Sequence, residues 1–483
     1  MKKIICAALI AVLSSPCKGQ NTAPEAVLPI PEPKQVEWQK METYAFIHFN
    51  TNTFNDLEWG YGDSDPQTFN PKKLNCEQWA RTLRAAGMKG VILTTKHHDG
   101  FCMWPTDLTD YSIKKSPYKN GQGNIVKELS DACKKYGIKF GIYLSPWDRH
   151  QANYGTKEYV EYYHAQLKDL LSNYGPIFEI WFDGANGGDG WYGGAKEKRT
   201  IDRRTYYDFP RAYDLIKKNQ PQAVIFSDGG PDCRWVGNES GIAGYTNWSF
   251  LKKGVVYAGY PYAGELTTGH ADGNQWTPAE CDVSIRPGWF YHEKEDDKVK
   301  TPEELANIYY SSVGRNATML LNFPVDKNGL IHPKDSANAV NFKKLIEKEL
   351  ANNLLAGRIA KVSSERGKKF TAKKITDGKY DTYWATPDNI NSGEVTFNFS
   401  KETIINRVMI QEYIPLGQRV KNFTIEYDKA GEWTPVKTEE KMTTIGYKRI
   451  VRFESIKTTG IRISFIDARG PLCINNIEAF YAQ

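Results

Sequence analysis

The stretch FEIWFDG, residues 178–184, is bulky and largely apolar until it stops at Asp183. A run of this length and composition is typical of a strand that is buried on both faces, as in a parallel sheet. A carboxylate at the end of such a strand requires an explanation, because burying an unpaired charge is costly. The segments on either side of this stretch supply the explanation.

Seven further stretches have the length and apolar character of strands: YAFIHFN (44–50), GVILTTKH (90–97), KFGIYLSP (139–146), AVIFSDGG (223–230), GYTNWSF (244–250), CDVSIRPGWF (281–290) and ATMLLNFP (317–324). Amphipathic helical patterns lie between many of them, and the clearest, residues 156–175, ends at Gly175. Buried strands that alternate with amphipathic helices indicate a parallel sheet with both faces covered. Eight such repeats over about 300 residues predict an α/β fold of the (β/α)₈ TIM-like barrel type. The stretch 244–250 has the weakest strand character of the eight.

The pattern changes near residue 355. Short alternating segments such as GEVTFNFS, KNFTIEYD and GIRISFID are separated by turn residues, and no amphipathic helix lies among them. This pattern predicts an antiparallel β-sandwich, and the helical segment 334–355 closes the barrel before it. We therefore expect a signal peptide in residues 1–20, the barrel in 21–354 and the sandwich in 355–483.

The first twenty residues, MKKIICAALIAVLSSPCKGQ, combine a basic start, a short apolar run and small residues. This is the pattern of a secretory signal peptide, and the apolar run is too short to cross a bilayer. Since no later segment is long enough either, we expect an exported protein, periplasmic or extracellular, without a membrane span. Cys17 leaves a lipoprotein anchor open, although Pro16 suits a lipobox poorly.

The charge pattern argues against a nucleic acid partner, and the cysteine pattern argues against a metal cage. The formal charge of +6 is small for 483 residues, and Lys and Arg are mixed with Asp and Glu, so no nucleic acid is expected as a partner. Six cysteines follow the first twenty residues, far apart and without CxxC spacing: Cys76, Cys102, Cys133, Cys233, Cys281 and Cys473. We expect buried thiols rather than a metal cage, with one disulfide left open.

Polar residues recur where the predicted strands end. They are His48, Asn50, Lys96, His97, His98, Asp99, Trp147, Asp148, Asp183, Asp228 and Arg286. A single aspartate at a strand end is commonly a helix cap, but the carboxyl ends of all barrel strands meet on one face, where barrel enzymes place their active sites. With the nearby tryptophans Trp59, Trp104, Trp181 and Trp289, these groups predict a pocket for a polyhydroxylated ring.

The motifs FIHFN, EWGYG, TTKHHDGF, WFDG and RNATMLLNFP resemble glycoside hydrolase family 29, the retaining α-L-fucosidases, over residues 30–350. The segments CRWVGNESG and ECDVSIRPGWFYH resemble the branch of that family that is selective for α-1,3 and α-1,4 linkages. The segment ITDGKYDTYWAT, residues 375–386, resembles discoidin-like sandwich domains of the coagulation factor V/VIII type C kind. The resemblance implies a fucosylated oligosaccharide or glycoconjugate as substrate.

The resemblance implies Asp183 as the nucleophile and Glu239 as the general acid/base, with Glu280 as the rival for the second role. A retaining glycosidase needs an ionised carboxylate that attacks the anomeric carbon and a second carboxyl group that protonates the leaving oxygen. No cofactor is expected for this chemistry.

The resemblance also implies a set of residues that hold the fucose hydroxyls and ring: His48, Glu58, Trp59, His97, His98, Tyr143 and Trp181. Arg286 and Trp289 are expected to shape either the fucose site or a platform for the neighbouring sugar. Because strand residues alternate in direction, His97 and His98 can both face the pocket only where the strand has begun to turn.

Several alternatives stay open. Asp377 and Asp381 are candidates for a structural Ca²⁺ site in the sandwich, and a simple Asp-Gly turn explains the same residues. The function alternatives are a broad α-L-fucosidase that also accepts α-1,2 linkages, a retaining glycosidase for another sugar, and a non-catalytic barrel that binds glycans.

Overall fold

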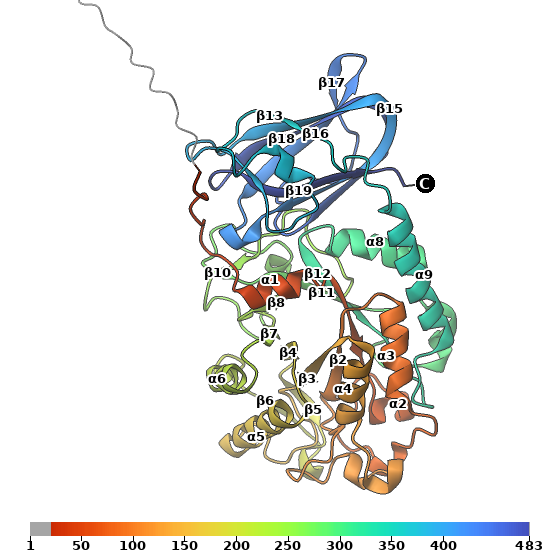
Figure 1. Ribbon diagram of the computed structural model, residues 1–483. Helices are drawn as coiled ribbons and strands as arrows, with labels where there is room; N and C mark the ends of the chain where they lie inside the picture. The colour runs from red at the N-terminus through yellow and green to blue at the C-terminus, as the bar shows by residue number, and fades with distance from the viewer. Residues whose placement is uncertain (1–20, 483) are drawn as a thin grey trace, which may run out of the picture.

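The computed structural model describes residues 21–482 and contains a closed barrel of eight parallel strands (Figure 1). In chain order the strands are β1 (Thr43–Ile47), β2 (Gly90–Lys96), β3 (Lys139–Leu144), β4 (Glu179–Trp181), β7 (Val224–Ser227), β8 (Cys233–Trp235), β11 (Ala279–Ser284) and β12 (Ala317–Asn322). The strands follow one another in chain order around the barrel, and β12 pairs with β1 to close it. The (β/α)₈ prediction is confirmed.

The predicted sixth strand is wrong. Residues 244–250 lie outside the barrel and lead into β9 (Phe250–Leu251), which pairs with β10 (Gln275–Trp276). The sixth barrel strand is β8, and its centre is the buried Arg234, which donates to the carbonyl of Leu266 and the side chain of Asn247. A strand of three residues with an arginine in the middle has no apolar run for sequence analysis to detect.

Six helices cover the outside of the barrel: α3 (Cys76–Ala85), α4 (Ile125–Tyr136), α5 (Lys157–Asn173), α6 (Phe209–Asn219), α8 (Pro302–Ser312) and α9 (Pro333–Glu349). The side chain of Asn75 caps α3, that of Asn124 caps α4, and Thr301 begins α8 with a capping box. Shorter elements occupy the connections: α1 (Pro33–Gln39), α2 (Thr51–Asn55), α7 (Ala263–Leu266) and the hairpin of β5 (Gly187–Gly190) and β6 (Glu197–Thr200).

Aromatic side chains fill the inside of the barrel. Tyr44 and Phe46 point inward from β1, and Trp181 of β4 stacks on Phe226 of β7 with ring centroids 4.0 Å apart. Tyr143 of β3 stacks on the other side of Trp181 at 5.3 Å. The filled interior therefore provides a rigid floor below the carboxyl ends of the strands.

The C-terminal domain is the predicted antiparallel β-sandwich. Its strands are β13 (Lys361–Val362), β14 (Trp384–Ala385), β15 (Gly393–Glu412), β16 (Val420–Lys429), β17 (Glu432–Pro435), β18 (Arg449–Ala468) and β19 (Cys473–Phe480). The long strands β15 and β18 pair along both halves, with shifts in register between them. One half carries β13, β16 and β17, and the other carries β19 and β14. The two long strands thus pass from one layer into the other.

The sandwich docks on the amino-terminal side of the barrel strands, as the blue domain at one end of the barrel in Figure 1 shows. Asn316, directly before β12, accepts from the backbone N–H of Tyr447, and Glu42, directly before β1, pairs with Lys448. The segment before α1 also reaches the sandwich, since Val27 donates its N–H to the carbonyl of Leu416 at 3.0 Å. The carboxyl ends of the barrel strands remain free of the second domain.

Three further expectations concern a disulfide, a membrane span and the N-terminal segment. All six cysteines between residues 21 and 482 are buried and free, so the open disulfide does not form among them. Within the same residues, no helix is long and apolar enough to cross a membrane. The signal peptide and Cys17 lie outside the described residues, and the domain boundaries stay predictions.

Candidate active site

A pocket opens at the carboxyl ends of the barrel strands. Its lining consists of Phe46, His48, Trp59, His97, His98, Tyr143, Trp181, Asp183, Glu239, Asp282 and Trp289. The structure therefore brings together seven of the nine predicted binding residues and both preferred catalytic carboxylates. Glu58, Arg286 and Glu280 are not among the lining residues.

Asp183 follows β4 by two residues, and its side chain is 23% exposed towards the pocket. Its carboxylate accepts hydrogen bonds from the Tyr143 hydroxyl at 3.0 Å and from the backbone N–H of Ala185 at 2.8 Å, and Nε2 of His98 lies 3.7 Å away. Burial raises the pKa of Asp183, and these two hydrogen bonds act in the opposite direction by stabilising the ionised form. The carboxylate is thus oriented and open on one side.

Glu239 lies four residues after β8, in the loop that the corrected sixth strand leads into. Its Oε2 accepts a hydrogen bond from the indole N–H of Trp289 at 3.1 Å. Burial raises the pKa of Glu239, and the negative charges of Asp183 and Glu58 raise it further. A raised pKa keeps a carboxyl group protonated and able to act as a general acid.

The three imidazoles of the pocket are neutral near pH 7. Burial lowers the pKa of His48 and of His98 to about 3, and it lowers the pKa of His97 well below its usual value. Nδ1 of His48 is 2.9 Å from Oδ1 of Asn322, and Nδ1 of His98 is 2.8 Å from the hydroxyl of Ser145. A neutral imidazole offers one donor and one acceptor, which suits sugar hydroxyls.

His97 and His98 both line the pocket because β2 ends at Lys96. Their ring centroids are 4.2 Å apart. Nδ1 of His97 is buried and has no hydrogen-bond partner among residues 21–482.

Trp59 and Trp289 are two aromatic walls of the pocket. Trp59 is 49% exposed and meets the ring of His98 edge-on at 4.9 Å, and Trp289 meets the ring of His48 at 5.2 Å. Glu58 lies behind the second wall, where it accepts from the backbone N–H of Trp289 at 2.9 Å and lies 2.7 Å from Nε2 of His292. Glu58 thus holds the loop that carries Trp289.

Arg286 does not face the pocket. Its guanidinium is buried and forms ion pairs with Asp335 and Asp296, both at 2.8 Å. Asp335 and Asp296 neutralise the charge of the guanidinium, and Arg286 is not a lining residue of the pocket. These ion pairs do not favour the expectation that Arg286 shapes the fucose site or its platform, which stays a prediction.

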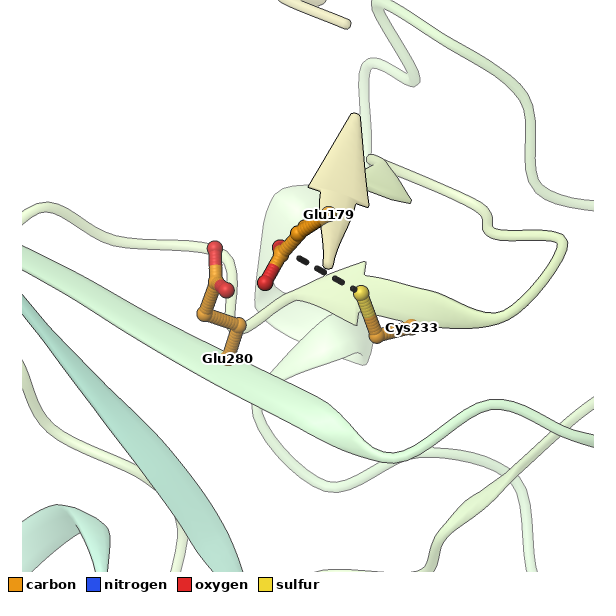
Figure 2. A group of neighbouring side chains, drawn as sticks. All are labelled: Glu179, Cys233 and Glu280. Atoms are coloured by element: carbon orange, nitrogen blue, oxygen red, sulfur yellow. Dashed lines mark hydrogen bonds between the residues drawn. The ribbon is translucent and has the colours of Figure 1, made fainter. Parts of the chain in front are cut away.

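Glu280 is buried on β11, with its side chain next to those of Glu179 and Cys233 (Figure 2). Its Oε1 accepts from the indole N–H of Trp181 at 2.7 Å, and its Oε2 accepts from the hydroxyl of Tyr44. Glu179 and Cys233 are its neighbours, and the ligand atoms of the three residues lie within 4.8 Å of one another. Because Trp181 separates Glu280 from the pocket, the position of Glu239 fits the acid/base role better.

The cluster of Glu179, Cys233 and Glu280 is the group of potential metal ligands found among residues 21–482. Hydrogen-bond donors already occupy its oxygens, since the indole N–H of Trp38 donates to Glu179 at 2.7 Å and Trp181 donates to Glu280. Burial and the neighbouring carboxyl group raise the pKa of Glu179 well above its usual value. These donors favour a buried carboxyl pair over a metal site.

The predicted calcium residues are not in that group. The carboxylate of Asp377 accepts from the hydroxyl of Thr382 at 2.7 Å and from the N–H of Lys379 at 3.0 Å, and the ammonium group of Lys374 is 3.7 Å away. These contacts close a turn and supply a positive charge. They fit the simple turn better than a Ca²⁺ site with Asp381, and the calcium site stays a prediction.

Sequence analysis missed Phe46 and Asp282. Asp282 lies in the middle of β11 and accepts from the indole N–H of Trp235 at 2.8 Å. Both residues share a face with a neighbour two positions away, Phe46 with His48 and Asp282 with Glu280. The alternation of strand residues could have found both.

Two carboxylates in different environments, set at the open end of a filled barrel between aromatic walls, form an arrangement that cleaves glycosidic bonds. The fold and the pocket together define a barrel glycoside hydrolase. Residues 25–344 match the family model described as "Alpha-L-fucosidase", and the chain belongs to this family. Residues 359–480 match the model of the F5/8 type C domain, which agrees with the discoidin-like resemblance.

Similar proteins extend along most of the chain. "Alpha-L-fucosidase 1" of Arabidopsis thaliana is 42% identical over 439 residues, which cover 90% of this chain and 83% of the plant protein. A crystal structure of a glycoside hydrolase 29 family member from an unknown rumen bacterium has a TM-score of 0.85 and 44% identity, covering 95% of this chain and 78% of that one. The Ruminococcus gnavus GH29 fucosidase in complex with fucose has a TM-score of 0.86 and 35% identity, covering 96% and 97% of the two chains.

Proposed function

We propose that the protein is an exported, retaining α-L-fucosidase that releases α-1,3- and α-1,4-linked L-fucose from branched glycans of the Lewis type. The observation that carries the proposal is that Asp183 and Glu239 line one pocket in different environments. Burial raises the pKa of both carboxyl groups, but two hydrogen bonds at Asp183 favour its ionised form, whereas the negative charges of Asp183 and Glu58 further favour the protonated form of Glu239. A retaining glycosidase requires this division between its two carboxyl groups.

In the first step, a carboxylate oxygen of Asp183 forms a bond to the anomeric carbon of fucose while the bond from that carbon to the glycosidic oxygen breaks. Glu239 gives its proton to the departing oxygen, so the rest of the glycan leaves as an alcohol. In the second step, Glu239 takes a proton from water, whose oxygen attacks the anomeric carbon and releases Asp183 as a carboxylate. Fucose leaves with its original anomeric configuration, and both residues return to their starting states.

The remaining lining residues suit L-fucose. His48 and His98 each have Nε2 left for a sugar hydroxyl, because their Nδ1 atoms contact Asn322 and Ser145, and Nδ1 of His97 has no partner among the described residues. The apolar faces of Phe46, Trp181 and Trp289 offer a wall for the C6 methyl group of the sugar. The pocket thus combines polar groups for three hydroxyls with an apolar surface.

Linkage selectivity rests on the contact between two loops. The segment CRWVGNESG carries Glu239, and the segment ECDVSIRPGWFYH carries Trp289, whose indole bonds to Glu239. A sugar next to fucose would reach both loops, so correct binding of that sugar would position the acid.

The test is a comparison of kcat/KM on a Lewis-type trisaccharide and on an aryl α-L-fucoside. A selective enzyme hydrolyses the trisaccharide much faster. Equal rates would instead support the broad α-L-fucosidase, and no release of fucose from any substrate would support a non-catalytic glycan-binding barrel.

Two parts of the proposal need their own tests. Export predicts that the mature protein lacks residues 1–20 and fractionates outside the cytoplasm. Calcium binding by Asp377 and Asp381 predicts a rise in Tm on adding CaCl₂ that is absent from Asp377→Asn.

A further inference from the structure

A tyrosine-rich loop, residues 252–262, lies next to the segments that carry the two catalytic carboxylates. The loop follows β9 and leads into α7, and it contains Tyr257, Tyr260 and Tyr262. Tyr262 is 64% exposed, the highest exposure of any large aromatic side chain in residues 21–482. The ring of Tyr262 is therefore accessible to a bound molecule.

The loop is held near the nucleophile at Gly259. The backbone N–H of Gly259 donates to the carboxylate of Asp228 at 2.7 Å. That carboxylate packs directly against Gly184, the residue after Asp183, where an added Cβ would lie 2.2 Å from its Oδ2. Arg203 adds a hydrogen bond to the carbonyl of Gly259 at 2.7 Å.

The C-terminal end of the loop is held near the acid/base. The carbonyl of Ala263, the residue after Tyr262, lies against Gly237, where an added Cβ would be 2.1 Å from it. Gly237 has a φ of +91° and precedes Glu239 by two residues. The segment 259–263 therefore lies between the segments that carry Asp183 and Glu239.

Aromatic side chains connect this segment to the pocket. Trp235 donates to the pocket residue Asp282 at 2.8 Å, and Trp235 and Tyr260 pack against the same apolar cluster of Leu251, Val256 and Leu266. The rings of Tyr260 and Tyr262 are 5.5 Å apart. The hydroxyl of Tyr260 donates to Glu265 at 3.1 Å, which holds this ring in place.

From this placement we infer that Tyr262, supported by Tyr260, is a binding platform for the oligosaccharide part of the leaving group, and that its ring packs on the C–H face of a hexopyranose. The inference rests on the proposed function, because the oligosaccharide that Tyr262 would hold is the leaving group of a fucoside bound at Asp183. The flat face of a tyrosine matches the apolar face of a pyranose ring, and the hydroxyl stays in water.

The experiment compares Tyr262→Ala, Tyr262→Leu and Tyr262→Phe on two substrates, a fucosylated oligosaccharide and an aryl α-L-fucoside that has no leaving-group sugar. Tyr262→Ala and Tyr262→Leu should lower kcat/KM for the oligosaccharide about 3- to 10-fold, mainly through KM, which corresponds to about 0.7–1.4 kcal/mol. Tyr262→Phe keeps the ring and should stay near wild type. All three variants should hydrolyse the aryl fucoside as the wild type does, which also shows that they fold.

Tyr481→Ala is the matched control, because Tyr481 is an exposed tyrosine of the sandwich domain. Equal effects of Tyr262→Leu and Tyr262→Phe on the oligosaccharide, or equal effects on both substrates, would overturn the platform while leaving the fucosidase intact. A wild-type protein that releases fucose from neither substrate would overturn the proposed function itself, and the platform with it.

Discussion

Trp181 donates its indole N–H to Glu280 at 2.7 Å from the last position of β4, two residues before Asp183. The same ring is stacked between Tyr143 and Phe226. A buried carboxyl group thus fixes the orientation of the pocket floor, and Tyr143 also donates to Asp183. We therefore expect Glu280 to act on the site through Trp181 rather than by touching the sugar.

The first prediction separates this supporting role from acid/base catalysis. Glu280→Gln keeps an oxygen that accepts from Trp181, so kcat/KM on a natural glycan should stay within about threefold of wild type. Glu280→Ala removes that acceptor and leaves a cavity, and should lower the free energy of unfolding by about 2–4 kcal/mol. Urea unfolding and steady-state kinetics check both values. If azide restored activity to Glu280→Ala, Glu280 would be the acid/base after all.

The second prediction concerns the nucleophile. Asp183→Ala should reduce turnover by about 10³-fold or more, because it removes the pocket carboxylate that is proposed to form the bond to the anomeric carbon. The fold should persist, since the side chain faces the pocket rather than the core. Azide should partly restore turnover and yield a fucosyl azide of inverted configuration, which NMR identifies. A rescued product of retained configuration would contradict the assignment.

The third prediction concerns the acid/base. Glu239→Ala should lower kcat on natural glycans about 10²- to 10⁴-fold, because their leaving oxygen needs a proton. Aryl fucosides with acidic leaving groups should be affected much less in their first step. Azide should here give a product of retained configuration. Trp289→Phe is the matched variant, because it removes the N–H that holds Glu239 and keeps an aromatic wall.

Most residues of the site could be predicted because they follow the ends of strands in the sequence. His48, His97 and Asp183 each follow an apolar run, and the closure of a parallel barrel brings the ends of such runs together whatever their separation in the chain. Arg286 has the same signature, but its partners Asp335 and Asp296 come from later segments, and no strand pattern reveals an ion pair between separate elements.

The sixth strand shows a different limit. Residues 244–250 are apolar because Trp248 and Phe250 pack with Trp276 and with Ile414 of the sandwich, not because they enter the barrel. Contact with a second domain produces the same apolar pattern as contact with a sheet. Glu239 lies just after the true strand β8, as expected for a residue of the active site. The prediction of the sixth strand at 244–250 concealed this relationship.

The fourth prediction is the pH dependence of kcat/KM. Asp183 must be ionised, and burial raises its pKa, so activity falls as the pH drops through that value. Glu239 must be protonated, and burial raises its pKa as well, so activity falls as the pH rises through it. His48 and His98, with a pKa of about 3, stay neutral across this range. Glu239→Gln should remove the basic limb measured with an aryl fucoside, and a basic limb that persists would point to another acid.

The last prediction concerns the junction of the two domains, which lies at the end of the barrel opposite the pocket. Glu440 of the sandwich pairs with Arg315 at 3.0 Å and with Arg449 at 2.8 Å, and all three side chains are almost completely buried. Glu440→Ala leaves two buried guanidinium groups without a carboxylate and should lower the free energy of unfolding by about 3–5 kcal/mol.

The matched control is Glu454→Ala, which breaks an exposed pair with Lys437 of the same domain and should cost about 0–1 kcal/mol. Because the barrel floor separates this junction from Asp183, kcat on an aryl fucoside at a temperature where both variants are folded should match wild type. Differential scanning calorimetry and steady-state kinetics measure the two effects. A loss of kcat in folded Glu440→Ala would show that the sandwich influences the pocket through the barrel, and equal stability of the two variants would show that the buried pair does not hold the domains together.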